Sequence, residues 1–302
     1  MATTSAYNLN DAGACERYQS LWEKTRGIFA SLRYARAVES VYGLKSSFWF
    51  ADEDASLLVH LKGGGPLRRA VIPPFTQYSS LLLPTPPASH LIHRQKSPMD
   101  ILLQCVEKTC RRADLLIQVD DPRTAQWRNW KVQPLFTYLI PLPSHPDDWS
   151  GTSRRTWRGK KGDYEIQENS VYAHQVIDLC RASYKRHGRS LPADATLLGA
   201  FAKAMGQYAR TFVALRDGTI EAGLIILHDE STAHYWVAGS EPGPSMTVLI
   251  GEVLSILSAS GISIFDFVGA NTPSIAEFKR SFGPTLTQYY HLRRRPPFLP
   301  GR

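Results

Sequence analysis

The sequence predicts an α/β protein built from two modules, each with a mixed, mostly antiparallel sheet flanked by helices. Segments with helical and strand periodicity alternate along the chain, and a similar order of segments occurs in both halves. Between the halves lies PLPSHPDDWSG at 141–151, which is rich in proline and polar residues and has no periodicity. We therefore expect two domains, residues 1–145 and 146–302.

The second half has the clearer pattern. Asp217-Gly218 stands between two apolar runs, and an Asp-Gly pair is typical of a tight hairpin turn. Leu249, Val253 and Leu257 recur at helical spacing. We expect helices at 170–186, 193–208 and 244–259, and strands at 211–216, 220–227, 233–239, 262–267 and 285–292.

The first half repeats this order less clearly. Gly63–Gly65 predicts a hairpin turn and not a phosphate-binding loop, because no helix follows it. We expect helices at 11–22, 31–41 and 98–112, and strands at 47–51, 55–61, 115–120 and 136–142. The shared order of helix, two strands, helix and strand predicts an internal duplication.

Composition narrows the functional classes. The net charge of +8 at pH 7 favours an anionic partner, although a solvated basic surface explains it equally well. No run of about 18 apolar residues predicts a membrane span, and the first residues do not predict a secretory signal. The four cysteines, with no CxxC pair, predict reduced thiols in the cytoplasm. With no HExxH motif or Cys/His quartet, we expect no metal and no tightly bound cofactor.

The segment DFVGANTPSIAEFKRSFG at 266–283 is the most informative about chemistry. A strand ends near Phe267, Gly269 permits an unusual turn, and Thr272 with Pro273 predicts the start of a helix. On that helix, Lys279 lies at the edge of an apolar stripe. Its ammonium in a partly dry place would stabilise a negative oxygen. Alternatively, its stem covers the neighbouring rings and the ammonium reaches water.

A basic cluster, SRRTWRGKKG at 153–162, is the second candidate. Arg154 and Arg158 are suited to phosphates, and Trp157 to stacking on a base. Gly159 and Gly162 weaken a helix there. A solvated basic face is the alternative interpretation of the same residues.

FVGANTPSIAEFKRSFG followed by TQYYHL resembles the C-terminal signature of FemABX-type transferases and related tandem GNAT-like acetyltransferases. Residues 137–161 resemble the junction between the two domains of that family, and 73–84 resemble a strand region of its first domain. The resemblance implies two tandem GNAT-like domains, of which the second is catalytic. It further implies that Lys279 holds the oxyanion or the donor's 3′ end, that Phe278 packs against the donor, and that Asn271 contacts substrate.

Acylation of an amine requires loss of a proton and stabilisation of a tetrahedral oxyanion. Asp266, at the end of the buried strand, is the candidate proton acceptor, and Tyr235 is the candidate that positions the amine. A capping role for Asp266 and core packing for Tyr235 are the alternatives. The histidines show no spacing that predicts a triad.

The donor loop distinguishes two kinds of co-substrate. GNAT proteins usually bind CoA pyrophosphate through a basic, glycine-rich loop at a helix N-terminus. The equivalent segment here, AGSEPGPSMT at 238–247, contains Glu241 and no Lys or Arg. This favours aminoacyl-tRNA as donor and leaves acyl-CoA as the alternative.

The sequence thus predicts an N-acyltransferase that joins an aminoacyl group to an amine-bearing small molecule or peptide. An acetyl-CoA-dependent N-acetyltransferase is the alternative, and a non-catalytic GNAT-like module that binds an anionic ligand is the second alternative. The acceptor, the pathway and the oligomeric state do not follow from the sequence.

Overall fold

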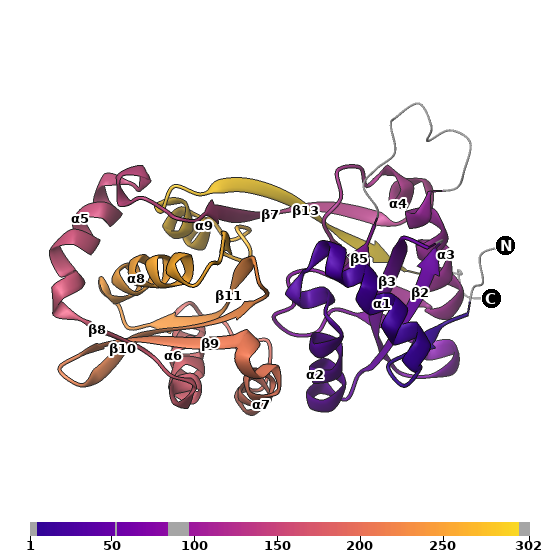
Figure 1. Cartoon of the computed structure of the whole chain (residues 1–302), viewed down its shortest axis with the longest axis horizontal. Helices are drawn as coiled ribbons and strands as arrows, with labels where there is room; N and C mark the ends of the chain where they lie inside the picture. The colour runs from indigo at the N-terminus through magenta and orange to yellow at the C-terminus, as the bar shows by residue number, and fades with distance from the viewer. Residues whose placement is uncertain (1–4, 52, 84–96, 296–302) are drawn as a thin grey trace. The chain divides into compact units, whose positions relative to one another are not determined.

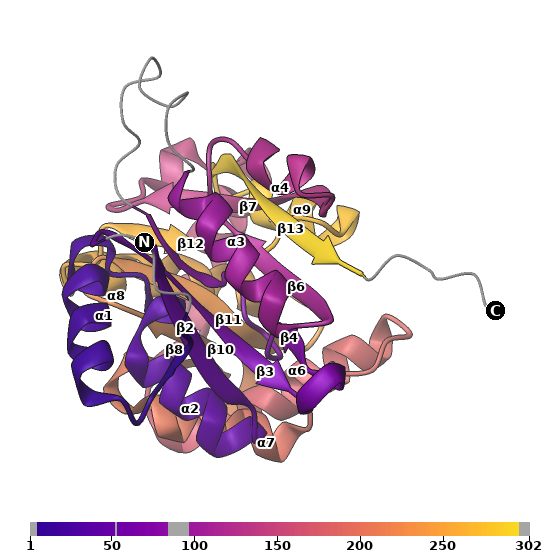
Figure 2. The ribbon, with the colours of Figure 1, turned by 90° about the vertical axis from the view of Figure 1, so that its right-hand side faces the viewer.

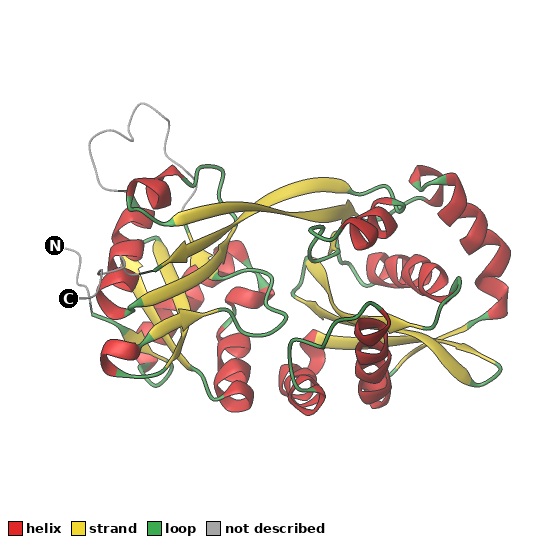
Figure 3. Cartoon of the chain, turned by 180° about the vertical axis from the view of Figure 1, so that it is seen from behind, coloured by secondary structure: helices red, strands yellow, loops and turns green. Residues whose placement is uncertain are grey.

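The computed structural model describes residues 5–51, 53–83 and 97–295 (Figure 1). The chain divides into two compact units. The first unit contains the residues up to Leu135 and those from Gln288 onward, and the second unit is Phe136–Thr287. Each unit has one mostly antiparallel sheet with helices on it (Figure 3), so the predicted fold class is confirmed.

The division differs from the predicted boundary at residue 145. Strand β7 (Lys131–Pro141) begins in the first unit and ends in the second, and β13 (Thr285–Arg294) leads back into the first. The division falls inside a continuous strand beside one proline, Pro134, whereas the 141–151 segment has several turn-forming residues, so the sequence pattern favours the later position. PLPSHPDDWSG instead includes the end of β7 and the start of the next helix.

The first unit has the strand order β1-β2-β3-β4-β6-β13, with β5 also paired to β3 (Figure 2). The pair β4–β6 is parallel and the others are antiparallel. The elements are α1 (Ala12–Thr25), α2 (Leu32–Tyr42), α3 (Pro98–Thr109), α4 (Arg123–Trp127), β1 (Tyr7–Asn8), β2 (Lys45–Ala51), β3 (Ala55–Lys62), β4 (Arg69–Val71), β5 (Ser80–Leu82) and β6 (Arg112–Ile117).

Side-chain caps explain why the helices of the first unit begin where they do. The side chains of Asp11, Ser31 and Ser97 each accept a hydrogen bond from a backbone N–H in the first turn of α1, α2 and α3. On one side of the sheet, apolar residues of β2, β3 and β6 pack with α3. On the other side, Phe48 and Leu58 pack with α1 and α2. Helix α3 ends, and β6 begins, about three residues earlier than the sequence pattern predicts.

The second unit has the strand order β7-β12-β11-β10-β9-β8. Its elements are α5 (Gly151–Lys160), α6 (Ala173–Arg186), α7 (Ala195–Met205), α8 (Ser245–Ala259), α9 (Pro273–Arg280), β8 (Glu165–Glu168), β9 (Ala209–Arg216), β10 (Thr219–His228), β11 (Thr232–Ser240) and β12 (Ile264–Asp266). Helix α8 lies on one face of β9–β11, and α6 and α7 lie on the other (Figure 1). The predicted meander is confirmed, with Asp217-Gly218 in its first hairpin.

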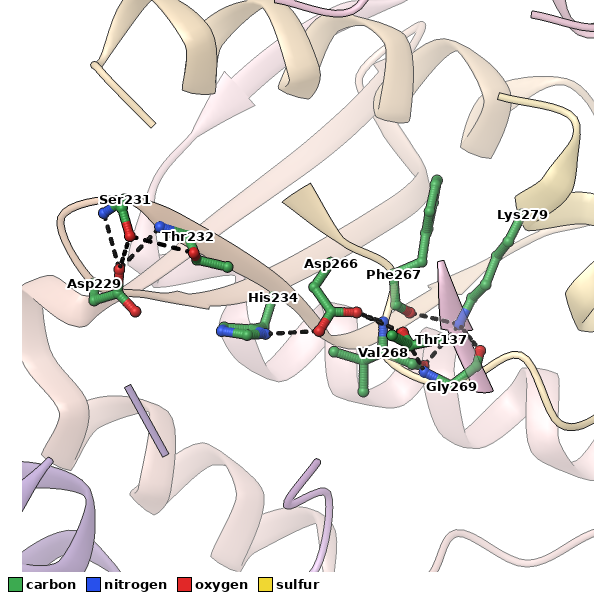
Figure 4. A network of polar contacts seen from close by, with 10 residues as sticks. All are labelled: Thr137, Asp229, Ser231, Thr232, His234, Asp266, Phe267, Val268, Gly269 and Lys279. Carbon is green, nitrogen blue, oxygen red and sulfur yellow. Dashed lines mark hydrogen bonds and ion pairs between the residues drawn. The ribbon is translucent and has the colours of Figure 1, made fainter. Parts of the chain in front are cut away.

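The turns of the meander are fixed by residues that the pattern identified. Asp217 and Gly218 both have positive φ, the conformation that a two-residue hairpin requires. In the second turn, Asp229 Oδ1 accepts hydrogen bonds from the backbone N–H groups of Ser231 and Thr232 (Figure 4). None of the described helices has both the length and the apolar character needed to span a lipid bilayer.

Helix α6 packs very closely on β11 because Gly239 has no side chain. A Cβ on Gly239 would lie 2.2 Å from the backbone nitrogen of Cys180, and backbone atoms cannot move aside as a flexible side chain can. Contact this close therefore depends on glycine.

Replacing Gly239 by alanine should destabilise the protein. We expect Gly239→Ala to lower the free energy of unfolding by at least about 2 kcal/mol, because β11 and α6 must separate. Gly159→Ala is the matched control: nothing lies near that position in α5, so stability should stay the same or rise by up to about 1 kcal/mol. Urea unfolding measures both changes, and equal stability of the two variants would contradict the close packing.

Candidate active site

Strands β11 and β12 separate soon after they meet. They pair in parallel at only three positions, from Thr232 opposite Ile264 to His234 opposite Asp266. Strand β12 then ends, whereas β11 continues to Ser240. We call the opening between Tyr235–Ser240 and the residues after Asp266 the fork. Within the described ranges, no strand pairs with this edge of Tyr235–Ser240.

A β-bulge explains the separation. Ile225 lies opposite Val237 while Ile226 lies opposite Tyr235, so β11 has one extra residue, Trp236, at this point. A bulge bends the strand that contains it and increases its twist. The bend follows directly after His234, the last residue of β11 that pairs with β12.

Asp266 is anchored at the base of the fork. Its side chain is 1% exposed. Oδ1 accepts hydrogen bonds from the Thr137 hydroxyl at 2.5 Å and the Val268 backbone N–H at 2.8 Å, and Oδ2 lies 3.3 Å from His234 Nδ1 (Figure 4). Burial acts to raise the pKa of Asp266, but His234 and these hydrogen bonds outweigh it, so the pKa lies below its usual value.

Lys279 reaches the same place from α9 and is 5% exposed. Its Nζ donates hydrogen bonds to the carbonyl oxygens of Phe267, Val268 and Gly269, at 2.6, 2.9 and 2.9 Å (Figure 4). Burial lowers the pKa of Lys279 to about 8, while the charge of Asp266 acts in the opposite direction. The ammonium therefore lies in the interior with three carbonyl partners and does not reach water at the surface.

The three carbonyls belong to a strained turn. Val268 has φ +52° and Gly269 has φ +81°. A β-branched residue seldom adopts positive φ, because its side chain crowds the backbone there. The hydrogen bonds from Lys279 compensate for this strain, so the lysine shapes the end of β12.

Aromatic rings line the fork beside Lys279. The Lys279 Nζ lies 5.1 Å from the centre of the Tyr235 ring, a cation–π distance. Tyr235 also packs against Phe265 and Phe267, and its hydroxyl lies 3.7 Å from the sulfur of Met246. Phe278 is half-buried and packs edge-on against Phe282. The structure thus brings Tyr235, Lys279 and Asp266 together.

The geometry does not fit the predicted role of Asp266 as proton acceptor. A general base works best with a pKa near the working pH and must reach the proton that it removes. The buried carboxylate of Asp266 has a lowered pKa, and both of its oxygens already contact other groups. The Asp266 carboxylate instead holds the 266–269 turn in place through these contacts.

Asn271 is held by the backbone of the second unit. Its side-chain oxygen accepts a hydrogen bond from the Phe136 N–H, and its Nδ2 donates to the Phe136 carbonyl. With these two hydrogen bonds, the Asn271 side chain pairs with the backbone of β7 as a neighbouring strand would. It fits a structural role better than the predicted contact with substrate.

The predicted basic cluster is largely paired in the structure. Trp157 donates to Glu252 of α8 and contacts Gly251, so its ring packs on α8. Arg154 and Arg158 both lie within 3.4 Å of Asp147. Trp157 is therefore not an open platform for a base, and Asp147 offsets part of the positive charge.

The N-terminus of α8 differs from a pyrophosphate site. Residues Ser245–Ile250 are buried, so the first-turn N–H groups are covered. Glu241 is exposed in front of this turn, and Arg186 pairs with it at 3.5 Å. A phosphate here would be repelled by the Glu241 carboxylate and would compete with it for Arg186.

The sequence pattern missed His234 and Thr137. Neither residue stands near Asp266 along the chain; they meet only because β11 and β7 pair on either side of β12. The strand register, which the sequence does not reveal, was the needed signal. Among the described residues, no three His, Cys, Asp or Glu side chains gather as a metal site would require.

Comparison with known proteins defines the class. Residues 152–280 match the family model of the acetyltransferase (GNAT) domain. Among solved structures, FemX is similar with a TM-score of 0.70 and 10% identity, covering 95% of this chain and 96% of that one. The C-terminal domain (DUF2156) of a putative lysylphosphatidylglycerol synthetase from Agrobacterium fabrum is similar with a TM-score of 0.60 and 15% identity. The match covers 93% of this chain and 91% of that one.

A tandem GNAT protein from the clavulanic acid biosynthesis pathway is also similar, with a TM-score of 0.56 and 13% identity, covering 96% of this chain and 97% of that one. No curated protein sequence matches the chain. The chain therefore has a FemABX-type tandem GNAT fold, and most of its second unit matches the acetyltransferase (GNAT) domain model. The predicted family resemblance is confirmed at this level.

Replacing Asp266 by asparagine should weaken the second unit in a pH-dependent way. At pH 7 we expect Asp266→Asn to cost about 2 kcal/mol of unfolding free energy, because the amide cannot accept from all three partners. The folded pKa of Asp266 is lowered, so its stabilisation exists above about pH 4 and is lost as the pH falls through the folded pKa. Urea unfolding at pH 7 and pH 3.5 should show the difference from wild type shrinking with acid.

The control is Asp217→Asn, in an exposed turn whose positive φ suits asparagine equally well. It should change stability by less than about 0.5 kcal/mol at either pH. An Asp266→Asn protein as stable as wild type at pH 7 would contradict the anchoring role.

Proposed function

We propose that this protein transfers an aminoacyl group from aminoacyl-tRNA to an amine of a small molecule or peptide. The observation that carries the proposal is the fork, where a free strand edge, the Tyr235 ring and the buried ammonium of Lys279 meet. A GNAT-type fold with a cationic group at this opening supports acyl transfer.

The reaction forms one bond and breaks one. The acceptor nitrogen attacks the ester carbonyl, and a tetrahedral oxyanion forms. Its collapse breaks the bond to the ribose oxygen, and the proton lost by the amine balances the charge on that leaving oxygen. Since Asp266 is not placed as a base, the acceptor amine must enter the site unprotonated.

Lys279 is the candidate that stabilises the oxyanion. In the free protein its three N–H groups donate to carbonyls, so the oxyanion would replace one of them. Val268 and Gly269, at the more exposed end of the strained turn, are the candidates for exchange. Tyr235 would hold the reacting groups against β11, and Phe278 would border the donor.

The choice of donor rests on the N-terminus of α8. Its buried first turn, the exposed Glu241 and the absence of Lys and Arg from residues 238–247 all disfavour a bound pyrophosphate. The similarity to FemX and to a putative lysylphosphatidylglycerol synthetase agrees with aminoacyl transfer. Arg154 and Arg158 on α5 remain candidate phosphate contacts. Trp157 packs on α8 and Asn271 bonds to β7, so neither is proposed to touch the substrate.

Acyl-CoA is the second candidate donor, and the free edge of β11 favours it. An extended ligand with amide groups can add to such an edge as another strand would. A non-catalytic module that binds an anion is the remaining candidate.

The four cysteines support a reducing compartment such as the cytoplasm. Cys15, Cys105, Cys110 and Cys180 are all free and buried. Buried free thiols are typical of proteins in which disulfides do not form.

A donor screen tests the proposal. Purified protein is offered charged tRNA or acyl-CoA together with a panel of amines, and products are followed by mass spectrometry. RNase treatment of the donor should abolish product with tRNA and leave product from acyl-CoA unchanged. Product from acyl-CoA alone would replace the proposed donor, and no product from any donor would favour the binding module.

Loss of the Lys279 ammonium should reduce turnover strongly. We expect Lys279→Met to lower kcat by about 10²-fold or more with the donor that works, as removal of an oxyanion contact does elsewhere. Arg280→Met, which changes the exposed neighbour, is the control and should keep kcat within about twofold. Circular dichroism checks that both variants fold, and full activity of a folded Lys279→Met protein would exclude the mechanism.

Turnover should also fall at high pH. Lys279 must be protonated to hold an oxyanion, and its pKa is about 8, so kcat/KM should decline as the pH rises through 8. At lower pH, kcat/KM should rise with pH, because the acceptor amine attacks only when it is unprotonated. In Lys279→Arg the guanidinium stays charged, so any remaining activity should lose this decline. An identical alkaline limb in wild type and Lys279→Arg would contradict the assignment.

A further inference from the structure

The first unit carries a line of cations across neighbouring strands, far in sequence from the residues of the fork. Lys62 of β3 lies opposite Arg69 of β4, and Arg69 lies opposite Arg112 of β6. Arg294 pairs with Ala113, so the next residue, Arg295, continues this register opposite Arg112. Figure 2 shows β3, β4 and β6 side by side in this order. We call Lys62, Arg69, Arg112 and Arg295 the cationic row.

Members of the cationic row share one side of the sheet. Directly opposite residues on paired strands point the same way, and Ala70 and Ala113, the next residues along, lie in the buried core on the other side. All four row residues are exposed. With strands about 4.8 Å apart, the row extends roughly 14 Å.

Little within the described ranges neutralises the row. The side chains of Lys62, Arg69 and Arg112 have no hydrogen bond or ion pair with another described residue. Arg295 donates to Asp114 at 3.0 Å, and His291 contacts the same carboxylate. Like charges placed directly opposite each other on paired strands destabilise a sheet. The row therefore costs stability in the free protein, and an anionic ligand would remove that cost.

We infer that the cationic row binds the phosphodiester backbone of a nucleic-acid strand, for which RNA is the probe. A line of cations matches a line of phosphates, whereas a single phosphate would engage only one or two members. Anionic lipid headgroups also attract clustered cations, and the vesicle arm of the test distinguishes them from the phosphodiester chain. This inference concerns a surface other than the fork and does not depend on the donor.

The test measures RNA binding at several salt concentrations. The probe is a short, fluorescein-labelled single-stranded RNA of mixed sequence, followed by anisotropy with the full-length protein. The row variant is Lys62→Gln/Arg69→Gln/Arg112→Gln, and the matched control is Arg181→Gln/Lys203→Gln/Arg280→Gln, three exposed cations of the second unit. Loss of three phosphate contacts should make the slope of log K against log salt shallower by about 2.

We expect the row variant to bind at least tenfold more weakly than wild type in low salt, and the control to bind within about threefold. The row variant should unfold thermally at the same temperature as wild type or higher, since repulsion has been removed. Binding of the same three proteins to anionic phosphatidylglycerol vesicles is measured in parallel. The inference is overturned if wild type does not bind RNA, if the row and control variants lose affinity equally, or if only vesicle binding depends on the row.

Discussion

The arrangement of the second unit depends on a buried ammonium that has three carbonyl partners. Lys279 can lie in the interior because Phe267, Val268 and Gly269 accept its hydrogen bonds and the Asp266 carboxylate lies nearby. These bonds stabilise a turn that is strained at Val268 and link α9 to the end of β12. This turn ends β12, and the bulge at Trp236 bends β11 away, so β11 continues alone with an open edge.

The carboxylate of Asp266 and the ammonium of Lys279 therefore differ in their proposed roles. Asp266 is saturated by Thr137, Val268 and His234 and holds the base of the fork. The Lys279 ammonium lies 5.1 Å from the centre of the Tyr235 ring, and we propose that it contacts the oxyanion there. A site with a cation but no placed base suits attack by an amine that is already neutral, and it relies on electrostatics more than on proton transfer.

The sequence predicted the fold class and most elements because their signals are local. The Asp217-Gly218 turn and the spacing of apolar residues in α8 each depend on neighbours along the chain. The unit division was not predictable, since it falls inside the continuous strand β7. Some helices and strands start or end a few residues away from the predicted positions, because sequence patterns are weak at the ends of elements.

The site was predictable only in part. The sequence singled out Lys279, Asp266 and Tyr235, which do meet, but it could not show that Lys279 would be saturated or that Asp266 would be anchored. Those facts depend on strand register and on the bulge at Trp236, which bring His234 and Thr137 to Asp266. For Trp157 the local pattern was misleading. Its basic neighbours favoured stacking on a base, whereas its ring packs on α8.

We propose that the reacting end of the donor lies against β11 at the fork. Hydrogen exchange of the backbone amides, measured with and without a non-hydrolysable aminoacyl-RNA analogue, tests this most directly. We expect slower exchange for amides of Tyr235–Ser240 that are not bonded to β10, with no change in the distant Asp217-Gly218 hairpin. Binding of the analogue with unchanged exchange at Tyr235–Ser240 would contradict it.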